Sequence, residues 1–319
     1  MQNDLANVAM RRETPGAQTG EAHKGDGREE TAMAKGPYPG DTLRRLQEAE
    51  LEVLLAIDAV CREAGISYFL DGGTCLGAVR HGGFIPWDDD VDVGMAYDEY
   101  LRFVEVAPTL LSAGYSLHSS LDTPGYAPLW VKVFKDGTRF IDRDAAEAGL
   151  LQGIFVDVFP YRQLSRRARV ARRQIRWGTI CQRVSFLRHT AHPKIPKGTP
   201  LRPVAIAGCV AAHAVLSRVV SQQAIVRRFE KVWNVPDPGD RWVDACYPWR
   251  DACDYDTIFP LGSIEFEGRV FPAPRNPDRF LTDLYGDYHQ LPPEDERYTH
   301  LPQVLDFGDG VNVMTGESL

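Results

Sequence analysis

The 319-residue sequence has no CxxC pair and no other tight metal-binding spacing among its six cysteines. Scattered cysteines argue against a zinc-binding module, and free cysteine is among the residues most often buried. Cys246 and Cys253 could form a metal set with His289 or His300, and we rank this alternative below buried structural thiols. We therefore expect reduced cysteines in a cytoplasmic protein.

Long apolar runs are also missing. No stretch reaches the ~18 to 20 apolar residues that span a bilayer, and the N-terminus lacks the apolar core of a signal peptide. We therefore expect neither secretion nor a membrane-spanning segment. Residues 1–40 contain very few large apolar side chains, so burial of these side chains cannot offset the conformational entropy lost on ordering. They are therefore predicted to form a disordered tail.

Acidic residues are absent between Asp157 and Glu230, although the whole chain carries a formal net charge of -8. The overall charge argues against a nucleic-acid binder, because phosphate contacts come mainly from clustered Lys and Arg. Residues 162–235 are locally basic and include an almost wholly apolar run at 204–220. We interpret them as a helical insertion that binds an anionic acceptor or the inner face of a membrane, where each basic residue adds about 1 kcal/mol. An ordinary helical subdomain with a solvated arginine face is the alternative.

Hydrophobic periodicity predicts the order of the elements. Residues 41–62 carry apolar side chains at helical spacing and predict an amphipathic helix, and residues 97–111 predict a second one. Short apolar runs predict strands, and the first of them enters a tight turn at Asp71-Gly72-Gly73. These runs are residues 66–70, 91–95, 129–134 and 154–159. The C-terminal part is rich in Pro, Tyr and Trp and is predicted to close over a site.

The acidic run that ends at Asp92 is the most informative part of the sequence. Side chains alternate between the faces of a strand, so Asp88, Asp90 and Asp92 would share one face while Val91 and Val93 anchor the other. Carboxylates held this close repel one another unless a divalent cation neutralises them. The alternative is a solvated acidic turn, which is what an isolated run of aspartates usually forms.

A further carboxylate, Asp157, lies inside the apolar run GIFVDVFP. A charge at such a position is neutralised, hydrogen-bonded within the core or shared with a cation, and a cation shared with Asp90 and Asp92 satisfies it most simply. Oxygen ligands of this kind suit Mg²⁺ or Mn²⁺ rather than Zn²⁺. Three carboxylates on neighbouring strands predict a phosphoryl-transfer site with its metal ion at Asp90, Asp92 and Asp157.

Groups that can bind phosphate surround the acidic strand. The Gly72-Gly73-Thr74 turn offers backbone amides, and Arg80 and His81 offer side chains that can pair with phosphate oxygens. A surface loop with ordinary polar contacts is the alternative for the basic pair. The glycine turn, the basic pair and the acidic strand together predict a site for phosphate and metal.

Two further side chains are candidates for the same site. Lys132 lies in an otherwise apolar strand and can contact a phosphate or balance the carboxylates, with a snorkelling edge lysine as the alternative. Trp87 can stack on a base or on a choline-like cation, with ordinary packing as the alternative.

Several blocks of the sequence resemble a known family. The segment LDGGTCLGAVRHGGFIPWDDDVDV resembles the signature of the LicD family, which is related to fukutin-type proteins within the nucleotidyltransferase superfamily. The segments WVKVFKDGTRFID, GIFVDVFP and FEGRVFPAPRNPDRFLTDLYGDYHQLPP resemble later blocks of that family in the expected order. The resemblance runs from about residue 41 to residue 298 and leaves out the N-terminal tail and the basic insertion.

The resemblance implies an α+β nucleotidyltransferase fold, similar to that of polymerase beta, with a mixed sheet core and a helical insertion. The catalytic core would be residues 41–161, followed by the insertion at 162–235 and by residues 236–319, which close the site. In such proteins a glycine turn holds the donor phosphates, and a Dx[DE] strand with a third carboxylate binds Mg²⁺. The matching residues are Gly72, Gly73, Thr74, Asp90, Asp92 and Asp157, with Asp88 as an additional family aspartate and Tyr285 in the C-terminal block.

The resemblance also implies a reaction. LicD-type proteins are associated with moving a phospho-alcohol such as phosphocholine from a CDP-activated donor to a hydroxyl of a cell-surface glycan or its lipid-linked precursor. By that analogy the acceptor hydroxyl attacks the outer phosphorus of CDP-choline in line, and CMP leaves. One of Asp88, Asp90 or Asp157 would help to remove the proton of the hydroxyl.

Three other functions use the same residues. A nucleotidyltransferase would attack the alpha phosphate of an NTP and release pyrophosphate, and a glycosyltransferase would use Asp90-Val91-Asp92 as a DxD motif with a nucleotide sugar. A catalytically silent protein would keep the fold only to bind its donor. The presence of all three aspartates argues against the silent protein, and the glycine turn with the later blocks favours the LicD interpretation over the glycosyltransferase.

Overall fold

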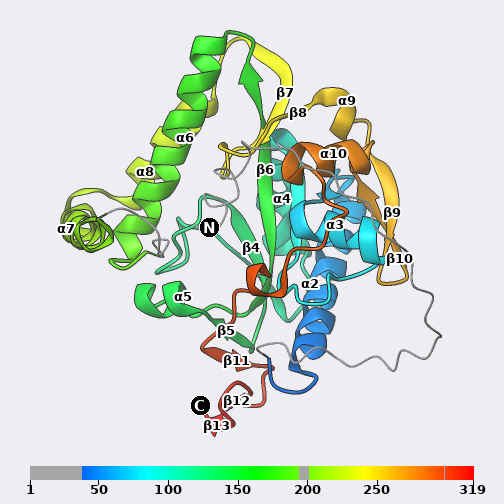
Figure 1. Cartoon of the computed structure of the whole chain (residues 1–319), viewed down its shortest axis with the longest axis vertical. Coiled ribbons are helices and arrows are strands. Elements are labelled where there is room, and N and C mark those ends of the chain that lie inside the picture. The colour runs from blue at the N-terminus through cyan, green and yellow to red at the C-terminus, as the bar shows by residue number, and fades with distance from the viewer. Residues whose placement is uncertain (1–37, 194–200, 298) are drawn as a thin grey trace, which may run out of the picture.

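The computed structural model describes residues 38–193, 201–297 and 299–319, so the predicted tail at 1–40 lies almost wholly outside the described residues. Its centre is a mixed sheet in the order β1-β2-β6-β4-β3, with β7 pairing with both β6 and β8 (Figure 1). Among the described strands of this sheet, β2 and β6 run parallel and the other neighbours run antiparallel. The strands are β1 (Phe69–Leu70), β2 (Asp92–Ala96), β3 (Tyr115–His118), β4 (Val131–Lys135), β6 (Ile154–Ser165), β7 (Pro238–Asp244) and β8 (Cys253–Asp254).

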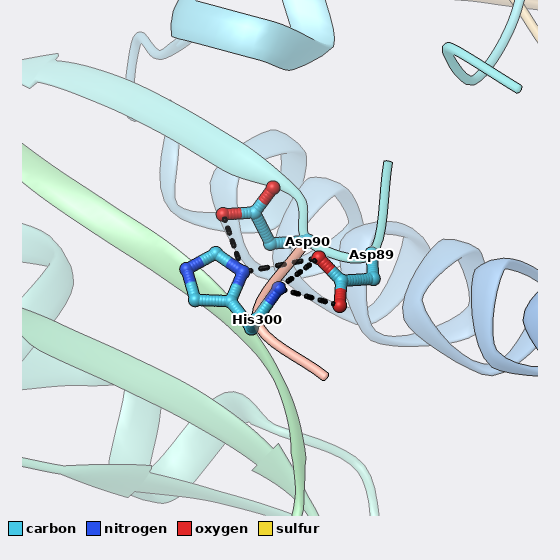
Figure 2. A group of neighbouring side chains, drawn as sticks. All are labelled: Asp89, Asp90 and His300. Atoms are coloured by element: carbon cyan, nitrogen blue, oxygen red, sulfur yellow. Dashed lines mark hydrogen bonds and ion pairs between the residues drawn. The ribbon is translucent and has the colours of Figure 1, made fainter. Parts of the chain in front are cut away.

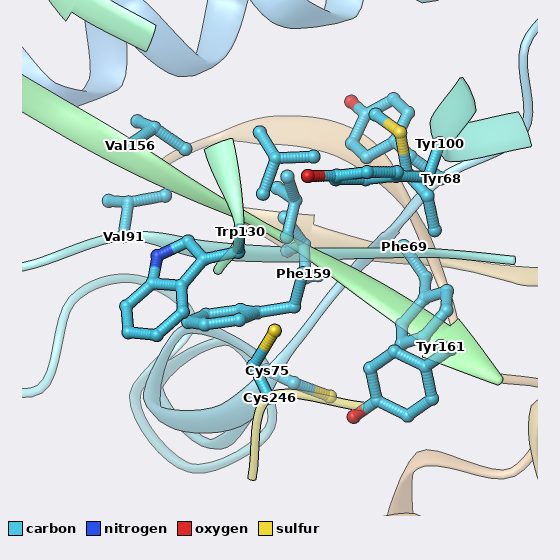
Figure 3. Close-up of a cluster of buried hydrophobic side chains, with 14 of the residues drawn as sticks. Tyr68, Phe69, Cys75, Val91, Tyr100, Trp130, Val156, Phe159, Tyr161 and Cys246 are labelled. Atoms are coloured by element: carbon cyan, nitrogen blue, oxygen red, sulfur yellow. The ribbon is translucent and has the colours of Figure 1, made fainter. Parts of the chain in front are cut away.

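The central place of β6 explains its sequence. Its residues from Ile154 to Phe159 are all buried, because β2 and β4 flank the strand and helices pack against it. The strands predicted at 129–134 and 154–159 are confirmed as β4 and β6. Aromatic side chains fill the core around them, among them Trp130 and Phe159, whose ring centroids lie 5.0 Å apart (Figure 3).

Helices flank this sheet on both sides in Figure 1. The predicted amphipathic helix is α2 (Thr42–Ala64), which buries Leu46, Val53 and Ile57 and packs against β6 and β4. The second predicted helix is α4 (Tyr97–Leu110), which packs against β2 and β6. The structure is therefore a mixed sheet with helices packed on it, as predicted at that level.

Two local predictions are wrong. The segment at 71–73 is not a tight turn, because Gly72 and Gly73 begin the helix α3 (Gly72–His81), with Asp71 as its N-cap. The acidic run is not a strand over its whole length, because β2 begins only at Asp92. The alternation of burial nevertheless holds: Asp89 and Val91 are buried, whereas the even-numbered aspartates of the run are partly exposed.

Residues 162–235 contain the end of β6 and three helices, which lie on the left of Figure 1: α6 (Ala168–His189), α7 (Arg202–Val219) and α8 (Gln222–Trp233). Among the described residues, α7 is long and apolar enough to cross a membrane by length and composition, and none of this window is buried in the structure. This finding qualifies the expectation that no segment could span a bilayer.

The remaining elements are short. They are β5 (Arg139–Ile141), α5 (Arg143–Ala148), α9 (Tyr255–Ile258), β9 (Gly262–Phe266), β10 (Arg269–Ala273), α10 (Pro277–Tyr285), η1 (Glu294–Glu296), β11 (Val304–Asp306), β12 (Val311–Asn312) and β13 (Glu317–Ser318). Of these, α10 contacts α3, and β11 pairs with β5. Segments from the C-terminal part therefore pack against α3 and extend the chain's pairing at β5.

Candidate functional site

A row of charged side chains crosses the middle of the sheet. Asp92 on β2 is paired in register with Asp157 on β6, which is paired on its other side with Lys132 on β4. Paired residues on neighbouring strands project from the same face, so these three side chains meet. The ammonium of Lys132 lies 3.1 Å from Oδ1 and 3.2 Å from Oδ2 of Asp157 and over the ring of Phe155.

Asp90 completes a cluster of three carboxylates with this row. Asp90, Asp92 and Asp157 each offer one oxygen, and these three atoms all lie within 4.8 Å of one another. Trp130 donates its indole N–H to Asp157 at 2.5 Å and fixes that carboxylate. Three hard oxygen donors at this spacing fit Mg²⁺ or Mn²⁺. The single positive charge of Lys132 does not balance three carboxylates.

The surroundings make the charged forms of these carboxyls unfavourable. Burial, together with the charges of Asp90 and Asp157, raises the pKa of Asp92 well above its ordinary value. Burial also raises the pKa of Asp90, against the opposing charge of His300. Burial and the charge of Asp90 raise the pKa of Asp88 well above its ordinary value. A divalent cation would remove this penalty, because its positive charge offsets the repulsion among the carboxylates.

The raised pKa values predict how stability depends on pH when no divalent cation is present. A carboxyl whose pKa is higher in the folded than in the unfolded protein stabilises the fold at low pH, and this stabilisation is lost as pH rises through the folded-state value. Burial raises the pKa of Asp244 to about 7, so the stabilisation by this carboxyl is lost between the ordinary aspartate pKa range and about pH 7. The raised pKa values of the carboxyls at the cluster act in the same direction.

With a chelator present, we therefore expect the melting temperature to fall between about pH 4 and pH 7. Millimolar Mg²⁺ should flatten this dependence, because the bound cation would remove the repulsion at the cluster. Thermal melts across that range, with and without Mg²⁺, measure both effects. A chelated protein that becomes more stable as pH rises would contradict the assignment of these shifts.

The two glycines at the start of α3 face the carboxylates. A Cβ on Gly72, whose φ is +49°, would lie 2.9 Å from Oδ2 of Asp92, and a Cβ on Gly73 would lie 3.0 Å from Oδ2 of Asp88. The hydroxyl of Thr74 accepts a hydrogen bond of 2.8 Å from the backbone N–H of Asp92. The predicted Gly72-Gly73-Thr74 segment is thus a helix N-terminus beside the acidic cluster, and its amides and positive end suit an anion such as a phosphate.

The N-cap of α3 is itself held in place. Asp71 is 1% exposed and accepts hydrogen bonds from the N–H of Gly72 and from the hydroxyl of Tyr161, each at 2.7 Å. Its backbone N–H donates to the carbonyl of Asp92 at 3.0 Å. These bonds fix the start of α3 against β2, so the amides of the helix and the carboxylates keep one geometry.

The predicted basic pair lies at the other end of α3. Arg80 donates to the carbonyl of Tyr288 at 2.9 Å and lies close enough to Asp88 for that charge to act on its pKa, which burial lowers. His81 is largely exposed, and the partial desolvation of its ring, together with the charge of Arg80, lowers its pKa. The structure therefore brings Arg80 near the cluster through Asp88, and it gives His81 no contact with the three metal-type carboxylates among the described residues.

Trp87 and Tyr285 occupy different positions around the cluster. One face of Trp87 is covered by the guanidinium of Arg297, 4.2 Å from the ring centroid, so that face is already occupied by a cation. Tyr285, at the end of α10, is 40% exposed, and its hydroxyl lies 3.6 Å from the Cβ position of Gly72. The C-terminal part of the chain thus brings a tyrosine hydroxyl to the N-terminus of α3.

Asp89 has a structural rather than a metal-binding environment (Figure 2). Its carboxylate accepts from the hydroxyl of Tyr38 at 2.6 Å and from the backbone N–H groups of His300 and Leu301 at 2.8 to 3.1 Å. The ring Nδ1 of His300 lies 3.1 Å from Asp89 and 3.7 Å from Asp90. Asp89, Asp90 and His300 have metal-type spacing, but these bonds already use both oxygens of Asp89. Asp89 therefore ties the first described residue, Tyr38, and the segment at 300–301 to the cluster.

Sequence reasoning missed one carboxylate near the cluster. Glu50 on α2 is fully buried, and neither of its oxygens has a hydrogen-bond partner among the described residues. Burial, with the charges of Asp89 and Asp90, raises its pKa well above the ordinary value and so favours its neutral form. The available signal was the position of Glu50 on the apolar face of α2, four residues after Leu46.

The cysteines form no metal site with His289 or His300 in the described part of the chain. All six thiols are free, and five of them, including Cys246 and Cys253, are buried. The expectation of buried structural thiols is confirmed for these five.

Comparisons with known proteins point to one family. A family profile described as LicD/FKTN/FKRP, nucleotidyltransferase domain, matches residues 65–197. The chain is 29% identical over 277 residues to the lipopolysaccharide cholinephosphotransferase LicD of Haemophilus influenzae, a match that covers 81% of this chain and 96% of that protein. It is 39% identical over 82 residues to the ribitol 5-phosphate transferase FKRP of Homo sapiens, covering 24% of this chain and 16% of FKRP.

The mouse FKRP gives a similar result, with 35% identity over 105 residues that cover 27% of this chain and 20% of that protein. The chain thus spans nearly all of the bacterial relative but only a small part of FKRP. The interval matched by the family profile contains Gly72, Asp90, Asp92 and Asp157, and the similarity to the bacterial protein continues well beyond it. The chain therefore contains a LicD-family domain, and its similarity to the bacterial LicD protein extends over most of its length.

Proposed function

We propose that this protein is a metal-dependent phosphotransferase that moves a phospho-alcohol from a CDP-activated donor to a hydroxyl of a cell-surface glycan or its lipid-linked precursor. The observation that carries this proposal is the cluster of Asp90, Asp92 and Asp157 beside the N-terminus of α3. Carboxylates for a cation and helix amides for a phosphate are the two parts that phosphoryl transfer needs. The match of residues 65–197 to the LicD/FKTN/FKRP profile supports a nucleotidyltransferase-type fold for the domain that holds them.

Mg²⁺ or Mn²⁺ is the proposed cofactor, held by Asp90, Asp92 and Asp157. When bound there, such an ion would neutralise the diphosphate of the donor and the charge that develops on the leaving group. Trp130 and Lys132 fix Asp157, and Thr74 fixes the backbone at Asp92, so the ligand geometry is set before the donor binds.

The other residues act on the donor and the acceptor. The first-turn amides of α3, at Gly73 and Thr74, would hydrogen-bond the donor phosphates, and Arg80 and Tyr285 would contact their oxygens. The acceptor oxygen forms a bond to the outer phosphorus while the bond from that phosphorus to CMP breaks. The proton of the hydroxyl passes to a carboxylate of the site, for which Asp88, Asp90 and Asp157 are the candidates.

The relatives guide the choice of alcohol. The bacterial protein that matches most of this chain is named a cholinephosphotransferase, whereas FKRP, named a ribitol 5-phosphate transferase, matches only a short part of it. We therefore propose phosphocholine, donated by CDP-choline, as the first substrate to test. A cytoplasmic location suits this donor, and we propose no nucleic-acid partner.

Calorimetric titration tests the donor and the metal together. CDP-choline, CDP-ribitol, CDP-glycerol, a nucleotide sugar and the four NTPs are titrated with and without Mg²⁺ into the wild-type protein and Asp90→Ala. We expect Mg²⁺-dependent binding of one CDP-alcohol, with at least about a 10-fold loss of affinity in the variant, because one of three cation ligands is gone. Release of CMP on addition of a glycan acceptor then identifies the reaction.

Other outcomes favour the rival functions. Tight binding of an NTP with release of pyrophosphate would identify a nucleotidyltransferase. Tight binding of a nucleotide sugar would identify a glycosyltransferase that uses Asp90-Val91-Asp92 as its DxD motif. Absence of binding to every donor, by a protein that melts cooperatively, would leave a silent binding protein and refute the proposed transfer.

A further inference from the structure

The helix α7 is apolar and exposed along its whole length. None of its residues is buried, and Val204, Val215 and Val219 are 65%, 57% and 71% exposed. In Figure 1 it is the outermost element on the left of the molecule. Helices that are apolar around most of their circumference are ordinarily buried in a core or in a membrane, so this surface requires a partner.

One side of α7 contacts α6. The ring Nδ1 of His213 lies 2.9 Å from the carbonyl oxygen of Leu187 on α6, and Arg188 of α6 donates to the carbonyl of Val220 just after α7 at 2.8 Å. The opposite side carries exposed residues at intervals of three and four. They are Val204, Ala207, Gly208, Ala211, Ala214, Val215 and Val219.

The three helices of this segment carry exposed positive charge. Residues 158–229 contain no Asp or Glu. Arg183 on α6, Arg218 on α7 and Arg227 on α8 are exposed, and in the described part of the chain none of them forms an ion pair with an acidic side chain. An anionic lipid surface attracts a segment that combines basic and apolar residues. The basic residues bind the lipid headgroups, and the apolar residues enter the boundary between headgroups and acyl chains.

We propose that α7, together with these arginines of the same segment, docks the protein on the surface of an anionic phospholipid bilayer. The helix has 18 residues and is about 27 Å long, which is enough to cross the apolar layer. However, its midpoint is bonded to α6 through His213, and α8 begins three residues after its end. The helix therefore lies in the plane of the membrane surface rather than across the bilayer.

A second copy of the chain is a poorer partner for this face. A two-fold dimer places the same patch of both chains face to face, so Arg183, Arg218 and Arg227 of one chain would meet those of the other. No acidic residue of the segment is present to offset that repulsion. The membrane inference is independent of the proposed transfer reaction, since it rests on residues outside the acidic cluster.

Vesicle flotation with the full-length protein tests the inference. We expect the wild-type protein to float with mixed phosphatidylcholine and phosphatidylglycerol vesicles and much less with pure phosphatidylcholine. The triple variant Val204→Ser, Val215→Ser, Val219→Ser should weaken binding about 10-fold or more, because it removes apolar surface. The variant Arg183→Gln, Arg218→Gln, Arg227→Gln should lose a larger factor on anionic vesicles, about 100-fold, at about fivefold per arginine.

Matched controls separate docking from other effects. Val270→Ser changes a valine that is 61% exposed on β10, on the opposite side of Figure 1, and should bind vesicles like the wild type. Asp90→Ala should also bind normally, so a failure of the catalytic proposal would leave this result intact. Amide hydrogen exchange of the wild-type protein gives a readout without substitutions, and vesicles should slow exchange in residues 202–219.

Three results would overturn the inference. They are no flotation of the wild type, equal flotation of the serine triple variant and the wild type, and unchanged exchange at 202–219 in the presence of vesicles. A concentration-dependent dimer that the serine triple variant makes monomeric, with vesicle binding unaffected, would assign this face to a second copy of the chain.

Discussion

Replacing Asp92 by Asn should lower the rate of transfer by on the order of 10³-fold while leaving the metal-free protein at least as stable as the wild type. Asp92 is one of the three carboxylates placed to hold the cation, and Asn cannot supply its charge. In the absence of a cation that charge is unfavourable, since burial and the charges of Asp90 and Asp157 raise the pKa of Asp92. Its removal therefore relieves repulsion in the metal-free protein.

The neighbouring carboxylate Asp89 provides the contrasting control. Asp89→Asn loses the charge that holds Tyr38 and the backbone of His300 and Leu301, so it should destabilise the fold by about 2 to 4 kcal/mol. Its Mn²⁺ affinity, measured below its melting temperature, should change far less than that of Asp92→Asn.

Calorimetric titration of Mn²⁺ and thermal melts on both variants give the comparison. If Asp92→Asn binds Mn²⁺ like the wild type, or if Asp89→Asn is the variant that loses the ion, the cation lies in the group of Asp89, Asp90 and His300 instead. Equal losses of stability in both variants would instead indicate that Asp92 has a mainly structural role.

The acidic run shows how much of the site the sequence could predict. Alternation of burial along 88–93 was predicted from a strand, and it is found although β2 begins only at Asp92. An extended backbone alternates its side chains whether or not it pairs with a neighbouring strand. The meeting of Asp92 with Asp157 required only that two apolar runs pair in parallel, which is the register found.

The role of Asp89 could not be predicted in the same way. Its partners Tyr38 and His300 lie 51 and 211 residues away along the chain, and no local pattern connects them. The parts of the site that depend on periodicity were therefore predictable, whereas those that depend on long-range packing were not. Glu50 is intermediate, because helical periodicity marks it as a charge on an apolar face but cannot show what it faces.

The glycine segment was predicted for one property and has a second. Its amides were expected to hold phosphate, and the structure adds that the missing side chain of Gly72 leaves room for the carboxylate of Asp92. A turn prediction gave the right residues in the wrong element, because two glycines favour a turn in isolation whereas the N-cap at Asp71 starts a helix there.

Gly72→Ala should therefore lower the rate of transfer by about 100-fold or more, although the new side chain is only a methyl group. A Cβ at this position would lie 2.9 Å from Oδ2 of Asp92, so that carboxylate must move away from Asp90 and Asp157. The backbone also has φ +49°, where a residue other than glycine is strained by about 1 kcal/mol.

Gly82→Ala is the matched control, at the other end of the same helix. Gly82 has φ +70°, but nothing lies within 4 Å of the position of its Cβ. Both variants should lose a similar amount of melting temperature, because both carry the cost of a left-handed backbone. Only Gly72→Ala should lose Mn²⁺ affinity and transfer activity, since only its methyl group displaces a ligand of the cluster. If both variants keep full activity, the contact between the start of α3 and Asp92 does not set the geometry of the metal site; if both lose it equally, the integrity of α3 as a whole, rather than the position of Asp92, controls transfer.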